Sequence, residues 1–448
     1  MRFLNTVKNI WSVEDLRKRI GMTLLLVIIY RFGCYVVLPG INPDALTAMK
    51  SFTADGLMQL LDMFSGGAFS QASIFALGIM PYITASIVIQ LAGMVLPSFQ
   101  KMQREGESGR QKLNQYTRYL TVLILLVQGP AYLYNLRLQV VNAGGQVEMG
   151  IWTVIFLTVI LAAGSMFIMW LGERITDRGI GNGISFIILV GIIARLPVAL
   201  FYEFTSRMPG STGNQGGLIM FIVEIVLLFA VTIGAVLLVQ GTRKVPVQYA
   251  KRIVGNKQYG GARQYIPLKV NAAGVMPIIF AQAIMFIPLT LSGFGGGEAT
   301  HGFFATFSDI NGFWYNFVYF IMIVAFTYFY TAITVRPTQM AEEMKRNNGF
   351  IPGVKPGKKT AEYLDAIMNR ITLPGSLFLG IVAILPAFAR VFGISQNFAQ
   401  FFGGTSLLIM VGVVLDTLQQ IESHLMMHHY DGLMKDGKIK GRTTGSAY

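Results

Sequence analysis

Residues 217–240 read GLIMFIVEIVLLFAVTIGAVLLVQ, and residues 241–252 continue as GTRKVPVQYAKR. The first stretch is apolar except for Glu224 and two uncharged polar residues, and a membrane-spanning helix needs about 20 such residues. The second stretch opens a connection, residues 241–269, that holds seven Lys and Arg. An apolar span followed by a basic loop is typical of a membrane protein that keeps its basic loops in the cytoplasm.

The same alternation extends along the whole chain of 448 residues. If residues at a span end are counted with the adjoining connection, 30 of the 36 Lys and Arg fall in every second connection. The intervening connections hold five, and the last, Arg31, lies inside the first span. Only 13% of residues are charged, against about 25% in soluble proteins. The pattern predicts an all-α polytopic membrane protein with both termini in the cytoplasm and ten transmembrane helices, at about 20–38, 73–96, 116–134, 151–171, 184–201, 217–240, 270–291, 313–335, 371–389 and 402–420.

Ten spans divide into five and five around an external loop, residues 202–216. An odd number of spans per half gives the two halves opposite orientations, as in the inverted repeats of transporters and channels. We therefore expect an N-terminal half, 1–201, and a C-terminal half, 217–448. Two long cytoplasmic loops of the second half, 241–269 and 336–370, carry seven Lys or Arg each.

The second span is preceded by a short apolar segment, LMQLLDMF at residues 57–64, which is followed by Ser65-Gly66-Gly67. This segment is too short to cross a bilayer. Physical chemistry leaves two interpretations open. It is either a re-entrant element buried in the protein's own interior or an external helix at the membrane surface.

Signals for an enzyme or a metal site are weak. Residues 353–360, GVKPGKKT, have three residues between the glycines where a phosphate-binding loop needs four. His424 and His428 have a spacing that suits a metal, but no further ligand cluster supports them. We predict no catalytic residue, metal or cofactor. Glu224 inside the sixth span is either the coupling acid of an ion-coupled secondary transporter, the alternative function, or an acid that partly snorkels or is paired with another group.

Five stretches in chain order resemble the SecY family, the channel subunits of the bacterial Sec protein translocon. They are FSGGAFSQASIFALGIMPYI at 64–83, EGESGR at 105–110, GERITDRGIGNGIS at 172–185, PLKVN at 267–271 and FGGTSLLI at 402–409. The resemblance implies two pseudo-symmetric inverted halves around a central pore. Through this pore unfolded, signal-bearing polypeptides would cross the membrane, and transmembrane segments would leave sideways into lipid.

The resemblance also implies three internal sites. A constriction of aliphatic side chains would exclude water and ions; its members here would be Ile79, Ile83, Ile188, Ile279 and Ile409. A plug at about 57–69 would close the external side, with Leu57, Leu60, Leu61, Phe64, Gly66 and Gly67. A lateral gate between the second, third and seventh spans would contain Thr84, Gln128 and Asn271. The two halves would part about the external loop, residues 202–216, which would act as the hinge.

The basic loops resemble the family's docking surface for the ribosome and for the motor ATPase SecA. The matching residues are Arg243, Lys244, Lys251, Arg252 and Lys355. Lys355 stands where the family usually has arginine, so the charge is kept but the bidentate fork is lost. Further implied partners are the SecE and SecG subunits, YidC, SecDF and membrane lipid, and the implied location is the bacterial inner membrane.

Overall fold

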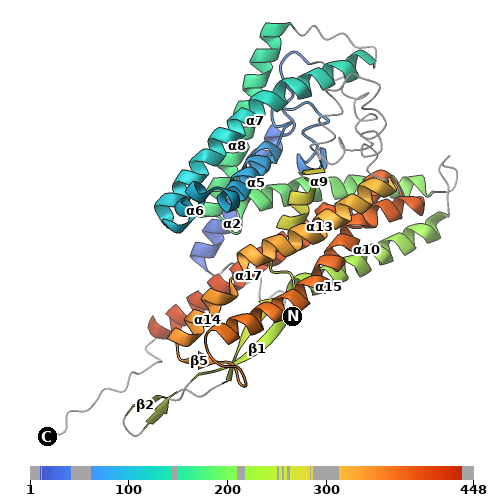
Figure 1. The fold of residues 1–448 in the computed structure, drawn as a ribbon. Coiled ribbons are helices and arrows are strands. Elements are labelled where there is room, and N and C mark those ends of the chain that lie inside the picture. Colours follow the sequence, from blue (N-terminus) through green and yellow to red (C-terminus); the bar gives the residue numbers. More distant parts are fainter. Residues whose placement is uncertain are drawn as a thin grey trace. The chain divides into compact units, whose positions relative to one another are not determined.

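The computed structural model folds into two compact units. The first unit comprises Met1–Ala54, Met58–Arg195 and Val413–Tyr448, and the second comprises Asp55–Leu57 and Leu196–Gly412. Long helices dominate both units (Figure 1). The structure describes residues 11, 13–41, 62–142, 150–208, 217–249, 252–254, 257–259, 263–282, 284–285 and 312–435.

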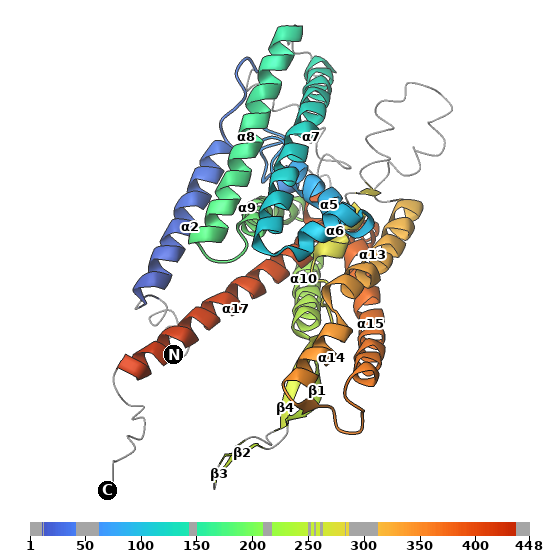
Figure 2. The same cartoon turned by 60° about the vertical axis from the view of Figure 1, so that its left-hand side comes forward.

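The first unit is centred on two long helices, α7 (Glu107–Asn142) and α8 (Ile151–Arg178), which run side by side (Figures 1 and 2). Leu133 and Leu136 of α7 join Leu157 and Leu161 of α8 in its buried apolar core. The other elements of this unit are α2 (Glu14–Gly33), α5 (Met80–Val95), α6 (Pro97–Arg104), the first part of α9 (Gly183–Ser206) and the last part of α17 (Gly404–Lys435).

The second unit packs α13 (Phe313–Thr334) against α15 (Lys358–Val391). Tyr315, Tyr319 and Ile323 of α13 are buried. The unit also contains α10 (Gly217–Gln240), α14 (Pro337–Arg346), the short α16 (Gln396–Ala399), a helical stretch at 276–282, and the first part of α17.

A small sheet joins the two basic loops of the second unit, in the order β4 (Arg263–Lys269), β1 (Thr242–Tyr249) and β5 (Gly349–Phe350). Both pairings are antiparallel, and Thr242 lies opposite Lys269. A separate hairpin pairs β2 (Arg252–Val254) with β3 (Lys257–Tyr259). These strands were not expected from the sequence, because the spans were recognised by apolar length and the loops only by charge.

Within the described residues, seven helices are long and apolar enough to cross a membrane, and α5 with α6 makes an eighth candidate. Many of their exposed side chains are apolar. On α10, for example, Ile219 is 78% exposed and Phe229 is 65% exposed. Apolar surface of this extent is stable only against lipid or another protein, so the helices have the character of membrane spans.

Several predicted spans begin or end elsewhere, and the helices of the third, fourth, ninth and tenth spans extend beyond the predicted bounds. The second span was expected from residue 73, but α5 begins at Met80, because the preceding residues form turns around Gly78 with φ of +56°. The fifth span continues in α9 to Ser206 instead of ending at 201. The helix of the first span, α2, ends at Gly33, and the seventh span is described only as far as residue 285.

Candidate functional site

Residues 62–79 form a largely buried segment between the first two spans, here called the turn segment: residues 62–64 are helical, and residues 65–79 form turns with one bridge at Ser73. Every side chain from Asp62 to Ser70 is buried. Residues 57–61, including Leu57, Leu60 and Leu61, lie outside the described residues. The described part is therefore packed inside the first unit and is not an exposed helix.

Two adjacent glycines allow the tight reversal in this segment. Gly66 has φ of +65° and Gly67 has φ of +95°, values that side chains with a Cβ rarely adopt. A Cβ on Gly66 would also lie 2.8 Å from Arg31 Nη1 and 3.0 Å from the Cα of Gly191. Both the turn and the close packing against α2 and α9 thus require glycine at position 66.

The backbone of the turn segment is held partly by its own hydroxyls. The Ser65 hydroxyl donates to the Asp62 carbonyl at 3.1 Å and accepts from the Phe69 N–H at 3.0 Å. The Gly67 N–H donates to the Asp62 carbonyl at 2.8 Å. Non-helical backbone at membrane depth must be satisfied by protein groups, and these bonds do so locally.

An ion pair connects the turn segment to α9. Arg195 Nη2 pairs with Asp62 Oδ2 and donates to the Ser70 hydroxyl at 3.0 Å. The other oxygen of Asp62 accepts the Ser70 N–H at 2.7 Å. The Asp62 side chain is 10% exposed and that of Arg195 is 33% exposed.

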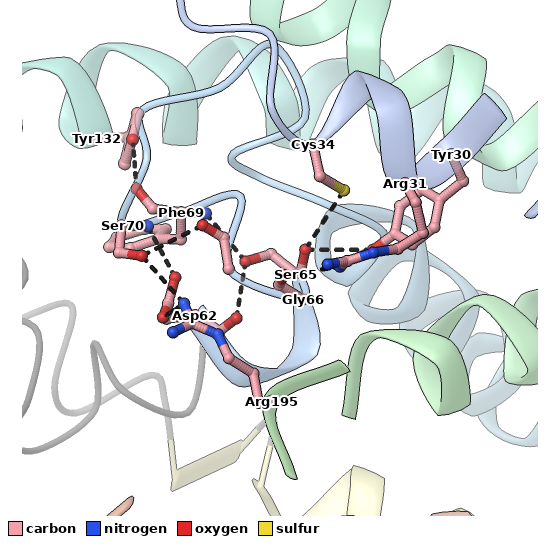
Figure 3. Close-up of polar contacts among 11 residues, drawn as sticks. Tyr30, Arg31, Cys34, Asp62, Ser65, Gly66, Phe69, Ser70, Tyr132 and Arg195 are labelled. Atoms are coloured by element: carbon pink, nitrogen blue, oxygen red, sulfur yellow. Dashed lines mark hydrogen bonds and ion pairs between the residues drawn. The ribbon is translucent and has the colours of Figure 1, made fainter. Parts of the chain in front are cut away.

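Three more side chains donate to carbonyls of the turn segment from α2 and α7. Arg31 donates to the Gly66 carbonyl at 2.9 Å, and the Tyr30 hydroxyl donates to the Ser65 carbonyl at 3.2 Å. Tyr132 of α7 donates to the Phe69 carbonyl at 3.0 Å, and the rings of these two residues meet edge to face at 4.8 Å. Together with the Asp62–Arg195 pair, these bonds are here called the latch contacts (Figure 3).

The backbone after α2 extends the contact. Val37 and Ser73 form an isolated antiparallel bridge. The Leu38 N–H donates to the Ala72 carbonyl, and the Ile74 N–H donates to the Val36 carbonyl, each at 2.9 Å. The turn segment is therefore held by side chains from three helices and by a strand-like pairing, all inside one unit.

Most of the chain, including the end of the turn segment, matches a known family. The family model for SecY matches residues 73–418, well over half of the chain. The chain belongs to the SecY family. Members of this family are channel subunits of a protein translocase, not enzymes.

A curated relative, the protein translocase subunit SecY of Streptomyces galbus, is 43% identical over 436 residues, covering 95% of this chain and 98% of the relative. One similar solved structure has a TM-score of 0.61 at 19% identity and covers 91% of this chain and 92% of that one. It is described as showing that the plug domain of the SecY protein stabilises the closed state of the translocation channel and maintains a membrane seal. Sec61 in a canine ribosome–channel complex from the endoplasmic reticulum has a TM-score of 0.54 at 16% identity, with coverage of 91% and 92%. The fold is therefore that of the SecY/Sec61 channels.

The isoleucines expected to form the SecY constriction are distributed over both units. Ile79, immediately before α5, and Ile188 in α9 are each 3% exposed, and Ile83 in α5 is half-buried. In the second unit Ile279 is half-buried and Ile409 in α17 is 2% exposed. The ring remains a prediction, because its members do not belong to one unit.

The expected lateral-gate residues differ in their bonding. Thr84 donates to the Met80 carbonyl of its own helix at 3.1 Å. Gln128 is half-buried in α7. Asn271 is 6% exposed, and its side-chain oxygen accepts no hydrogen bond from any described group.

The small sheet presents the expected docking residues in the second unit. Arg243 and Lys244 are exposed on β1, while Val245 and Val247 of the same strand point into a core with Leu364 of α15. Lys355 is exposed in a turn between β5 and α15, whose Gly353 and Gly357 have positive φ. Lys251 and the side chain of Arg252 lie outside the described residues.

Glu224 is a paired acid. Arg207 donates to Glu224 at 2.7 Å and to Glu203 at 3.0 Å. All three side chains are at most 2% exposed. The chain therefore neutralises Glu224 with a buried arginine from the end of α9, as the second interpretation of the sequence expected.

Sequence reasoning missed Asp62, Arg195 and Arg207 as structural partners. Their signal was present, because a charge inside or beside an apolar span is costly enough to need a partner. Sequence reasoning counted the two arginines only as loop charges. Tyr30, Ser65, Ser70 and Tyr132 carry no such signal, since hydroxyl groups are common in spans.

Proposed function

We propose that this chain is the central protein-conducting channel of a Sec translocon, passing unfolded, signal-bearing polypeptides across the membrane and releasing transmembrane segments laterally into lipid. The observation that carries the proposal is the turn segment with its latch contacts. A buried element held by a few polar bonds from surrounding helices has the properties of a removable closure. We propose that it is the described part of a plug at about 57–69.

The chemistry of the latch suits reversible closure. A helix inserted in the pore would satisfy its own backbone and would need no bonds from its neighbours. The turn segment instead depends on donors from Tyr30, Arg31, Tyr132 and Arg195. Each such bond has a modest net value of about 1 kcal/mol, or somewhat more where a charge takes part. A signal sequence with better contacts to the open state would supply enough free energy to release them.

We propose that Ile79, Ile83, Ile188, Ile279 and Ile409 form the constriction. Aliphatic side chains seal by excluding water and adapt to a passing chain of any sequence. Thr84, Gln128 and Asn271 would belong to the lateral gate. The buried side-chain oxygen of Asn271 accepts no hydrogen bond from the described groups, and this supports the assignment, because a buried polar atom without a partner calls for an explanation.

We propose that the exposed cations Arg243, Lys244 and Lys355 dock the ribosome and the SecA motor, with Lys251 and Arg252 in the same loop. The sheet that joins the two loops supports a single docking platform, since β1 pairs with both β4 and β5. The platform would face the cytoplasm of a bacterium, with both chain termini on that side of the inner membrane. SecE and SecG would complete the channel, and YidC and SecDF would be further partners.

A stalled secretory chain tests the proposal. The channel is reconstituted with SecE, SecG and SecA in vesicles, and a photo-crosslinker is placed at position 79 or 409. Both positions are expected to crosslink to a preprotein arrested in transit, while position 229, on the exposed apolar side of α10, is expected not to. Crosslinking at 229 but at neither pore position would contradict a central path. Ion-gradient-driven uptake of a small solute without preprotein transit would favour the transporter instead.

A further inference from the structure

The chain passes from one unit to the other inside a helix. The division between the units falls between Arg195 and Leu196, whereas α9 runs without interruption from Gly183 to Ser206. Pro197 is the second residue after the division and lies in the helix interior. Because proline has no N–H, the carbonyl of Ile193 lacks its helical hydrogen bond at this point, and the proline ring crowds the preceding turn.

The part of α9 before Pro197 is fixed to the first unit. Arg195 pairs with Asp62 and Ser70 of the turn segment. One turn earlier, Gly191 packs so closely that a Cβ on it would lie 3.1 Å from the Phe64 carbonyl. Ile192 is fully buried. This half of the helix cannot tilt without disturbing the latch contacts.

The part of α9 after Pro197 is fixed to the second unit by a buried charge cluster. Arg207 bridges Glu203 of α9 and Glu224 of α10, and it also donates to the Gly393 carbonyl at 2.8 Å. Glu203 accepts the Ser395 N–H at 3.2 Å. The rings of Phe204 and Phe221 pack edge to face at 5.5 Å, which adds an apolar contact between α9 and α10.

We propose that Leu196–Pro197 is the pivot about which α9 bends when the channel opens, and that residues 202–208 move as a rigid part of the second unit. The external loop was the expected hinge, but its first residues are locked by the Arg207 cluster. Bending there would break a buried ion pair, which is costly because it strands a charge. Bending at Pro197 costs little, because the helix already lacks the bond that would resist it. The pivot rests on the proposed function as an opening channel.

The second described crossing between the units is consistent with this placement. It falls between Gly412 and Val413, inside α17. Glycine in a helix interior leaves the backbone freer than any other residue. Both helical crossings therefore carry a residue that weakens the helix at the division.

Spin labels on exposed positions test the pivot. One label at Tyr202, which is 58% exposed, is paired either with Phe156 of α8 in the first unit or with Val226 of α10 in the second; these are 60% and 63% exposed. The distances are measured by electron paramagnetic resonance in the reconstituted channel, before and after a preprotein is arrested in it. We expect the 202–156 distance to change and the 202–226 distance to stay constant.

The reverse result, a constant 202–156 distance with a changing 202–226 distance, would place the hinge in the external loop and overturn the pivot. Two constant distances in channels that carry arrested preprotein would overturn it as well. The same labelled channels are assayed for preprotein transit. A channel that transports nothing would refute the proposed function, and the pivot with it, so that the two failures are distinguishable.

A matched pair of proline variants provides a second readout. Pro197→Ala restores the N–H to the helix, so we expect several-fold slower preprotein transit with a thermal stability equal to or above that of the native channel. Pro209→Ala, in the external loop, is expected to leave the rate unchanged. Slowing by Pro209→Ala alone would contradict the pivot.

Discussion

Asp62→Asn tests the strongest of the latch contacts. The variant keeps a side-chain oxygen for the Ser70 N–H but removes the negative charge that faces Arg195. Removing one partner of a fully buried ion pair costs about 3–5 kcal/mol. Since 33% of the Arg195 side chain is exposed, water recovers part of this loss. We therefore expect the closed arrangement to lose about 2 kcal/mol, a factor of about 30 in the closed-to-open ratio.

The assay is single-channel conductance of the reconstituted channel in a planar bilayer without substrate. The resting open probability of Asp62→Asn is expected to rise by a factor of about 30 while closed events remain. Arg118→Gln is the matched control. It breaks an ion pair of the same unit, with Glu173 at 2.8 Å, whose side chains are 47% and 30% exposed. Surface pairs contribute about 0–1 kcal/mol, and this pair does not touch the turn segment.

A double variant checks that the two charges act on each other. Asp62→Asn combined with Arg195→Gln should open the channel by less than the product of the single effects, because each single variant already removes the same pair. An open probability of Asp62→Asn equal to that of Arg118→Gln, with native thermal stability in all variants, would exclude the Asp62–Arg195 pair from holding the channel closed. Strict multiplication of the two single effects would also count against a shared ion pair.

Four further predictions concern other parts of the chain. Ile79→Gly should raise the resting ion leak, since it removes an aliphatic wall of the proposed constriction; an unchanged leak in vesicle flux assays would remove Ile79 from the ring. Gly66→Ala should destabilise the closed channel by more than Gly40→Ala, because both positions have positive φ but only at Gly66 would a Cβ meet neighbours within 4 Å; equal thermal shifts would exclude a packing role. Lys355→Glu should weaken binding of the motor or the ribosome, and the loss of affinity should be larger at low salt, where charge interactions are less screened. Binding equal to that of the native chain at every salt concentration would argue against docking at Lys355. Glu224→Gln should lower the stability by about 2 kcal/mol, because Arg207 then keeps only one of its two buried carboxylate partners. The pH dependence of transit should stay unchanged. Loss of transit with native stability would instead support the ion-coupling role.

Hydropathy and charge were sufficient for much of the architecture. A stretch such as 217–240 becomes a span because the bilayer interior excludes charge and requires a helix to satisfy its own backbone. The corresponding helix, α10, has the expected bounds, and α13 ends within one residue of its predicted end. Some boundaries failed because a helix continues past the apolar stretch into polar residues, as α15 does from Lys358, and others because local backbone geometry was decisive. The turns before Met80 follow from glycine conformations and tertiary bonds, which do not alter mean hydropathy.

The candidate site was only partly visible in the sequence. The short apolar segment before Gly66 and Gly67 left a re-entrant element or an external helix open, and the resemblance to the SecY family indicated its role. Neither indicated that Arg195, more than a hundred residues away, would pair with Asp62. Glu224 likewise has no account in the sequence until α9 brings Arg207 beside it.

The amino-acid order alone determined the membrane class, the alternation of basic connections and the family, because these depend on properties that each segment carries by itself: apolar length, charge and local motif. Only the tertiary structure decided which charges neutralise one another, which backbone carbonyls the hydroxyls of Tyr30 and Tyr132 satisfy, and where a continuous helix changes unit. The physical reason is that a hydrogen bond or ion pair acts over a few ångströms, and no pattern along the chain states which distant residues folding brings within that range.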